Sequence, residues 1–139
     1  MGSSATRVLR RTVIPFVLVG VIGFIVDAGT LHIIVALSGL PPLAARFFSF
    51  LLAAYTTWRL NRGFTFSDRS VGQGSLGEWL RYLSASSVGA AVNYGVFAAL
   101  VITLPLLANV QTYGVALGSL AGMAVNFSLY RLVVFPGRS

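Results

Sequence analysis

The sequence has no cysteine, no lysine, one histidine and three acidic residues among its 139 residues. Without cysteine, the chain has no disulfide, no thiolate chemistry and no cysteine-based metal site. His32 is the single imidazole, and the acids Asp27, Asp68 and Glu78 do not make a catalytic carboxylate pair. A phosphate-binding loop and a nucleophile elbow are also missing. We therefore predict that the chain is not an enzyme and uses neither a metal nor a cofactor.

Charge of both signs is scarce, whereas apolar residues are abundant. Charged residues make up 9% of the chain and hydrophobic residues 56%, against about 25% charged residues in soluble domains. Much of the surface is therefore expected to face lipid. All ten basic residues are arginine and the net charge is +7, which fits anionic lipid or a phosphate-bearing substrate. Nucleic acid is not expected as a partner, because the arginines flank apolar spans and form no basic face.

Four apolar spans predict an all-α membrane protein with four transmembrane helices. They run over Val13–Leu37, Leu43–Leu60, Tyr82–Leu104 and Tyr113–Tyr130. The second span is the weakest, because Arg46 lies near its start. Backbone groups in lipid must bond within their own segment, so each span should be a helix. Short connections with Pro41-Pro42 and Pro105 make each pair of helices a helical hairpin.

The arginines predict the orientation. Nine of the ten fall on one side of the predicted spans: Arg7, Arg10, Arg11, Arg59, Arg62, Arg69, Arg81, Arg131 and Arg138. The positive-inside rule assigns that side to the cytoplasm. Both termini should be cytoplasmic, in a multi-pass protein of the inner, cytoplasmic membrane of the cell.

An internal repeat organises this single domain of residues 1–139. The first span contains Gly23-x3-Asp27-x-Gly29 and the third contains Gly89-x3-Asn93-x-Gly95. The segments 58–66 and 127–135 also end alike, each on a phenylalanine. Repeat 1 covers about 7–66 and repeat 2 about 79–135, joined by a flexible linker at 67–78 that contains Asp68 and Glu78. Because both hairpins have the same orientation, the repeats are parallel, and transporters place substrates at such interfaces.

Two charged residues lie within the predicted spans. Asp27 lies near the middle of the first helix, where a charge costs roughly 3 kcal/mol on insertion scales. It serves as a proton or cation site or anchors a substrate hydroxyl, or it pairs structurally with an amide, a hydroxyl or an arginine. Arg46 is the basic residue on the outer side, and it either binds a phosphate, snorkels to the interface or reaches toward Asp27.

Further candidates are arginines at the cytoplasmic boundary and amides inside the spans. Arg59 and Arg62 share one helix face, and Arg131 occupies the matching place in the second repeat. Together they cradle a phosphate, or they only set the topology and meet helix C-terminal dipoles. Asn93 and Asn126 are amides in apolar helices, where hydrogen bonding between helices is the favoured role.

The sequence resembles the GtrA family of small four-helix membrane proteins. The resemblance rests on Gly23-x3-Asp27, on Asn61-Arg62-Gly63-Phe64-Thr65-Phe66 and on Asn126-Phe127-x3-Arg131-x3-Phe135. It implies a role in cell-surface polysaccharide synthesis, as a flippase of polyprenyl-phosphate-linked monosaccharides for outer-face glycosyltransferases. Arginines near each interface would then bind the phosphate, while Asp27 and the asparagines, Asn61 included, would contact the sugar or relay a proton. The second copy departs from the pattern, because Tyr130 stands where the first has Asn61.

Two other functions fit the same residues. A non-transporting membrane subunit would recruit a glycosyltransferase, with Asp27 and the arginines holding helices together. A small proton-coupled exporter of cations would use Asp27 as its membrane acid. Membrane lipids are expected partners in every case, and a homodimer is expected because four helices enclose little volume.

Overall fold

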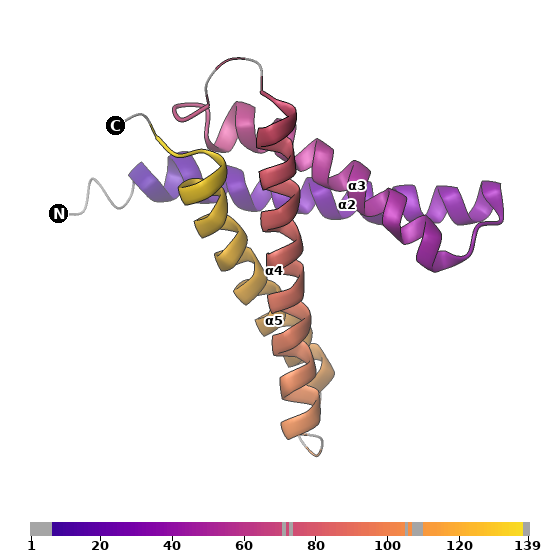
Figure 1. Ribbon diagram of the computed structural model, residues 1–139. Coiled ribbons are helices and arrows are strands. Elements are labelled where there is room, and N and C mark those ends of the chain that lie inside the picture. Colours follow the sequence, from indigo (N-terminus) through magenta and orange to yellow (C-terminus); the bar gives the residue numbers. More distant parts are fainter. Residues whose placement is uncertain (1–6, 71, 73, 105, 107–109, 138–139) are drawn as a thin grey trace. The chain divides into compact units, whose positions relative to one another are not determined.

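In a computed structural model, the residues described are 7–70, 72, 74–104, 106 and 110–137, and their regular structure is entirely helical (Figure 1). Pro105 and Arg138, used above for the turns and the orientation, lie outside these residues. The chain divides into two compact units, Met1–Trp79 with Gly137–Ser139, and Leu80–Pro136. We call them unit 1 and unit 2, and each is described by itself.

Unit 1 is built on a hairpin of two helices that run side by side, α2 (Ile14–Ser38) and α3 (Pro42–Leu60) (Figure 1). A wider turn, η1 (Leu9–Val13), precedes α2, and another, η2 (Asn61–Thr65), continues α3. The α2 helix ends at Gly39, whose φ of 65° is the left-handed conformation favoured by glycine. Pro41 and Pro42 then start α3, because proline suits the first helical position.

Unit 2 contains most of α4 (Leu76–Thr103) together with α5 (Val110–Leu129) and η3 (Tyr130–Val134). Small residues allow α4 and α5 to approach closely. A Cβ on Gly122 would lie 2.7 Å from the carbonyl oxygen of Gly89, and one on Gly118 would lie 2.5 Å from that of Asn93. The predicted close contact at Gly118-x3-Gly122 is therefore made within the chain, against α4.

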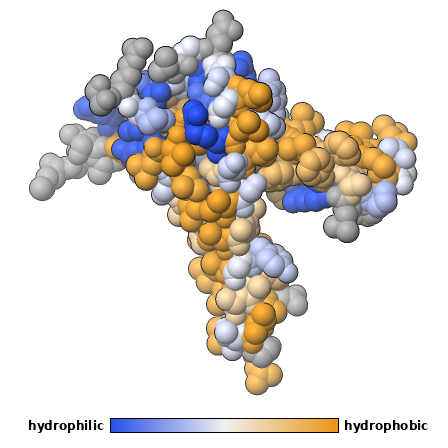
Figure 2. Space-filling model, viewed as in Figure 1, coloured by the Kyte–Doolittle hydropathy of each residue, from blue (hydrophilic) through white to orange (hydrophobic). Residues whose placement is uncertain are grey.

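Three helical stretches in the described residues are long and apolar enough to cross a membrane: Arg10–Ser38, Leu76–Thr103 and Tyr113–Val134. The predicted second span forms α3, but it falls short of this apolarity because it carries Arg46, Arg59 and several polar residues. Its 19 residues would still reach about 28 Å as a helix. Hydrophobic side chains cover much of the visible surface of the helices (Figure 2), as expected of a membrane protein.

Both α3 and α5 end in the same local structure. The N–H of Phe66 donates to the carbonyl of Asn61 at 2.7 Å, and the N–H of Phe135 donates to that of Tyr130 at 2.7 Å. Each bond spans five residues and closes a wider turn than an α-helix makes. Phe66 and Phe135 are both fully buried. The shared ending agrees with the sequence pattern, while the internal repeat as a whole stays a prediction.

The predicted linker at 67–78 is shorter in the structure, because α4 begins at Leu76. Ser75 caps this helix: its hydroxyl accepts from the N–H of Glu78 at 3.1 Å. Side chains also bind the preceding segment to η2, since the Ser70 hydroxyl lies within hydrogen-bonding distance of the carbonyls of Arg62 and Phe66. The segment is therefore attached to the end of α3.

Candidate functional site

A polar cluster lies inside the apolar α2–α3 hairpin and brings two of the predicted residues together. Arg46 Nη1 is 2.7 Å from Asp27 Oδ2, and the Ser49 hydroxyl donates to Asp27 Oδ1 at 2.6 Å. The Asp27 side chain is 16% exposed, whereas that of Arg46 is 56% exposed. Asp27 is thus neutralised by an arginine, one of the alternatives left open by the sequence. More than half of the Arg46 side chain therefore stays accessible.

The face of α3 that carries Ser49 continues as a row of small and polar residues. Ala45, Ser49, Ala53, Thr57 and Asn61 recur at helical spacing along it. Close approach of α2 is possible because Gly23 faces Thr57, where any Cβ on Gly23 would collide with the threonine methyl. The row leads from the Asp27–Arg46 cluster to the end of the helix.

A second polar cluster lies at the end of α3 and contains Arg62. Arg62 Nη1 donates to Glu78 Oε1 at 2.8 Å and to Oε2 at 2.7 Å, and its Nη2 donates to the carbonyl of Gly72 at 2.5 Å. The indole N–H of Trp58 also donates to Glu78 Oε1, at 2.8 Å. Arg62, Glu78 and Trp58 are all buried. Arg62 therefore has its charge satisfied within unit 1.

Glu78 corrects the sequence analysis. The prediction of a flexible linker over 67–78 is wrong for Glu78, which lies in the first turn of α4 and is buried against Arg62. The sequence carried a signal for this position, because Ser75-Leu76-Gly77-Glu78 has the Ser-x-x-Glu spacing of a helix N-terminus. In the structure Ser75 caps the helix as this spacing predicts, while the Glu78 carboxylate turns to Arg62.

The neighbouring candidates Asn61 and Arg59 differ in exposure. Asn61 is buried, and its Oδ1 accepts from the Thr65 hydroxyl at 2.7 Å. Arg59 is exposed, with its guanidinium carbon 5.6 Å from the centre of the Trp58 ring. A cation over an indole face is a favourable arrangement. The predicted joint phosphate site of Arg59 and Arg62 is therefore not formed in the structure, because Arg59 is exposed while Arg62 is bonded to Glu78.

In unit 2, the amides Asn93 and Asn126 lie at the contact between α4 and α5. The Asn126 amide packs on Gly89, where a Cβ would collide with it, and Asn93 packs on Gly118 and Gly122. The expected hydrogen bonds between helices are not formed by these two side chains within the described part of the chain. Asn126 Oδ1 is buried without a hydrogen-bond partner there. Both amides act in packing, and Asn126 keeps an unused acceptor.

The end of unit 2 is aromatic where the end of unit 1 is charged. Tyr130, at the place of Asn61, stacks on Tyr82 with ring centres 4.1 Å apart, and its hydroxyl lies 2.6 Å from that of Ser86. Phe135 meets Tyr82 edge to face at 6.4 Å. Arg131 is exposed. At the matching position of unit 1, Asn61 makes an amide contact with Thr65, whereas Tyr130 stacks on a ring and makes a hydroxyl contact.

Among the described residues, no group of three or more histidine, aspartate or glutamate side chains is placed to hold a metal ion. What the structure offers is two arginine–carboxylate pairs in unit 1, one partly exposed and one buried, and two packed amides in unit 2. Of these groups, Arg46 combines a positive charge with an accessible side chain and could bind an anion.

A family model described as GtrA/DPMS, transmembrane domain, matches residues 15–135. The match includes all four helices and confirms the resemblance to the GtrA family found in the sequence. No match to this chain was found among curated proteins.

Proposed function

The chain belongs to the GtrA/DPMS transmembrane-domain family, and on this premise we propose that it is a flippase of polyprenyl-phosphate-linked monosaccharides for cell-surface polysaccharide synthesis. The family itself indicates a membrane protein of glycosyl and polyprenyl-linked sugar pathways. A flippase of such lipids must move a phosphate and a sugar across about 30 Å of hydrocarbon while the tail stays in lipid.

The Asp27–Arg46–Ser49 cluster is the observation that carries this proposal. A guanidinium has five N–H donors, and in the described part of the chain the Arg46 guanidinium pairs with Asp27 through Nη1, at 2.7 Å. The side chain is 56% exposed, which leaves donors within reach of a ligand. Arg46 is therefore held in place by Asp27 and still able to bind a phosphate. In apolar surroundings such a charge-assisted bond is strengthened.

Two exposed arginines lie at different levels along α3. Arg46 lies in the second turn of this helix and Arg59 in its last turn, about 20 Å apart along the axis. Both arginines are exposed and project about 140° from each other around the helix, while Ser49 between them is buried and bonded to Asp27. In the predicted topology these arginines belong to opposite membrane sides. We therefore assign phosphate binding to Arg46 on the outer side and to Arg59 on the cytoplasmic side.

The test is head-group translocation by purified protein in proteoliposomes. A polyprenyl-phosphate monosaccharide is placed in one leaflet, and its appearance in the other is followed with a membrane-impermeant reagent. We expect the wild-type protein to move the lipid faster than empty liposomes, and Arg46→Gln to slow it at least tenfold, because a hydrogen bond to a charged group contributes about 1.5–3 kcal/mol. Asp68→Asn, a change at an exposed acid, is the control. Rates equal to those of empty liposomes for several sugar lipids would reject the proposal.

A second candidate function is that of a membrane subunit that recruits a glycosyltransferase without transport. The buried Arg62–Glu78 pair favours it, because both charges serve to attach the segment before α4 to the end of α3. In that case the protein co-purifies with a glycosyltransferase, while proteoliposomes of the purified protein show no flux.

A cation exporter is disfavoured by the Asp27–Arg46 pair, because the arginine already occupies the carboxylate on which a cation would bind. We further propose a homodimer, since a bundle of this size encloses little volume for a sugar. Cross-linking in intact membranes, with the protein expressed at a low level, tests the dimer directly.

A further inference from the structure

The two units differ in how their arginines are neutralised. In unit 1, Arg46 pairs with Asp27 and Arg62 with Glu78. Unit 2, Leu80–Pro136, has no acidic residue, and its charged residues are Arg81 and Arg131. Unit 2 therefore supplies no carboxylate of its own for Arg81.

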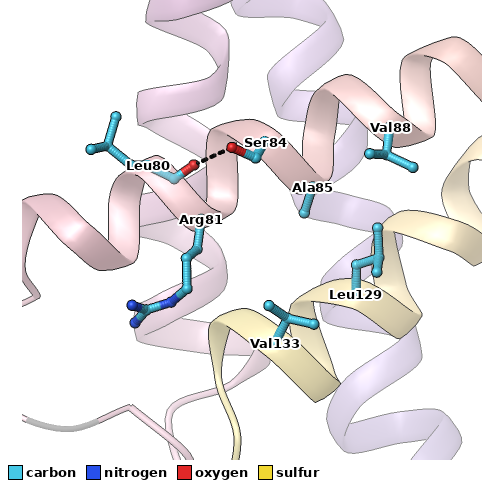
Figure 3. Close-up of a pocket in the computed structure, with 7 residues that line it drawn as sticks. All are labelled: Leu80, Arg81, Ser84, Ala85, Val88, Leu129 and Val133. Atoms are coloured by element: carbon cyan, nitrogen blue, oxygen red, sulfur yellow. Dashed lines mark hydrogen bonds between the residues drawn. The ribbon is translucent and has the colours of Figure 1, made fainter.

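Arg81 lies at one end of an open groove along α4. The groove has a volume of about 340 Å³ and is lined by Leu80, Arg81, Ser84, Ala85, Val88, Leu129 and Val133 (Figure 3). In Figure 3 the Arg81 side chain extends from α4 on the side of Val133, while Val88 and Leu129 lie at the other end. From Arg81 to Val88 the helix rises about 10 Å. The walls beyond the arginine are aliphatic.

Of the two polar residues that line the groove, Arg81 is the one whose hydrogen-bond donors are available to a ligand. Arg81 is exposed and has no hydrogen bond or ion pair within the described residues. Ser84, the other polar lining residue, donates its hydroxyl to the carbonyl of Leu80 at 2.9 Å. Glu78 lies three residues before Arg81 on α4, but its carboxylate is committed to Arg62. A ligand would thus meet one guanidinium followed by an apolar wall.

We infer that this groove binds a lipid that carries a phosphate on a single hydrocarbon chain, with the phosphate on Arg81 and the chain along Ala85, Val88 and Leu129. The arginine matches a phosphate in charge and in bidentate geometry. The volume lies near the lower end of ligand sites, about 300–1,000 Å³, which suits part of one chain. The inference rests on the proposed function, because a polyprenyl phosphate has this chemistry.

The experiment is equilibrium binding to the full chain in nanodiscs of phosphatidylcholine, which carries no net charge. The probe is a polyprenyl monophosphate, compared with the polyprenol that has the same chain and no phosphate. We expect Arg81→Gln to weaken binding of the phosphate at least tenfold and to leave the polyprenol unchanged. Arg11→Gln removes the same charge from an exposed position in unit 1 and should have no effect.

Filling the groove tests the chain-binding part. Val88 is 49% exposed and lines the groove, so Val88→Trp should weaken both the phosphate and the polyprenol. Val115→Trp changes an equally open position on α5 outside the groove and should weaken neither. Helix content by circular dichroism and a single gel-filtration peak establish that each variant is folded.

Three results would overturn the inference: equal weakening by Arg81→Gln and Arg11→Gln, no weakening by Arg81→Gln, or displacement of the probe by phosphatidylglycerol or inorganic phosphate at the same concentrations. Binding is measured without flux, so the two proposals fail separately. Specific binding without translocation rejects the flippase and keeps the groove. Translocation without binding at Arg81 rejects the groove and keeps the flippase.

Discussion

The Arg62 guanidinium donates from one nitrogen to both carboxylate oxygens of Glu78, at 2.8 and 2.7 Å, across 16 residues of sequence. This pair joins the end of α3 to the first turn of α4. Trp58 adds an indole N–H to the same carboxylate. Charge thereby holds the start of α4 at the end of α3, although the sequence between them is rich in Ser and Gly, as in a flexible linker.

Breaking this pair should destabilise the protein strongly. Glu78→Gln leaves the buried guanidinium of Arg62 without its counter-charge, which costs about 3–5 kcal/mol when one partner of a buried pair is removed. Thermal unfolding in detergent, followed by loss of helicity, should show a clear drop in the midpoint. Asp68→Asn removes an exposed acid and should leave the midpoint within error of wild type.

The double variant Arg62→Met with Glu78→Leu separates pairing from burial. Because no uncompensated charge then remains, it should unfold at a higher temperature than Glu78→Gln alone. Equal midpoints for the single and double variants would mean that the ion pair is not what stabilises this cluster.

The contact between α4 and α5 should depend on Gly89 and be indifferent to Gly95. A Cβ on Gly89 would collide with the Asn126 amide, whereas one on Gly95, on the same helix, meets nothing within 4 Å. We expect Gly89→Ala to destabilise by about 1–3 kcal/mol through overpacking. Gly95→Ala should be neutral or slightly stabilising, because alanine is the better helix former. Similar midpoints in both variants would contradict the close approach.

Asn126 should matter for transport and not for stability. Its Oδ1 is buried without a partner in the described residues, and an unsatisfied acceptor costs about 1–3 kcal/mol. Asn126→Leu should therefore keep or raise the unfolding midpoint and slow head-group translocation, because the amide oxygen that would accept from a sugar hydroxyl is lost. Ser128→Ala, on an exposed position of α5, is the matched control. A lower midpoint for Asn126→Leu would assign the amide a structural role.

The sequence predicted the helices well because each is a long apolar run. The predicted spans Val13–Leu37 and Leu43–Leu60 differ from α2 and α3 by one residue at each changed end. The start of α4 was missed, because Leu76–Arg81 is mixed in polarity and only its capping pattern signals a helix. The pairing of Arg46 with Asp27 was one of the alternatives that the sequence left open. The partner of Arg62 could not be predicted, since long side chains reach several neighbours and three-dimensional packing selects one. The unused acceptor of Asn126 likewise depends on packing against Gly89.

The most direct test of the account exchanges the two charges of the Asp27–Arg46 pair. The variant Asp27→Arg with Arg46→Asp retains an ion pair between α2 and α3 but removes the exposed guanidinium from position 46. Unfolding midpoints and head-group translocation in proteoliposomes are measured for wild type, both single variants and the exchange. We predict that the exchange recovers the stability lost by the single variants, while translocation stays at least tenfold below wild type. Recovery of the full wild-type rate would show that the pair only holds the hairpin together, and would contradict phosphate binding by Arg46.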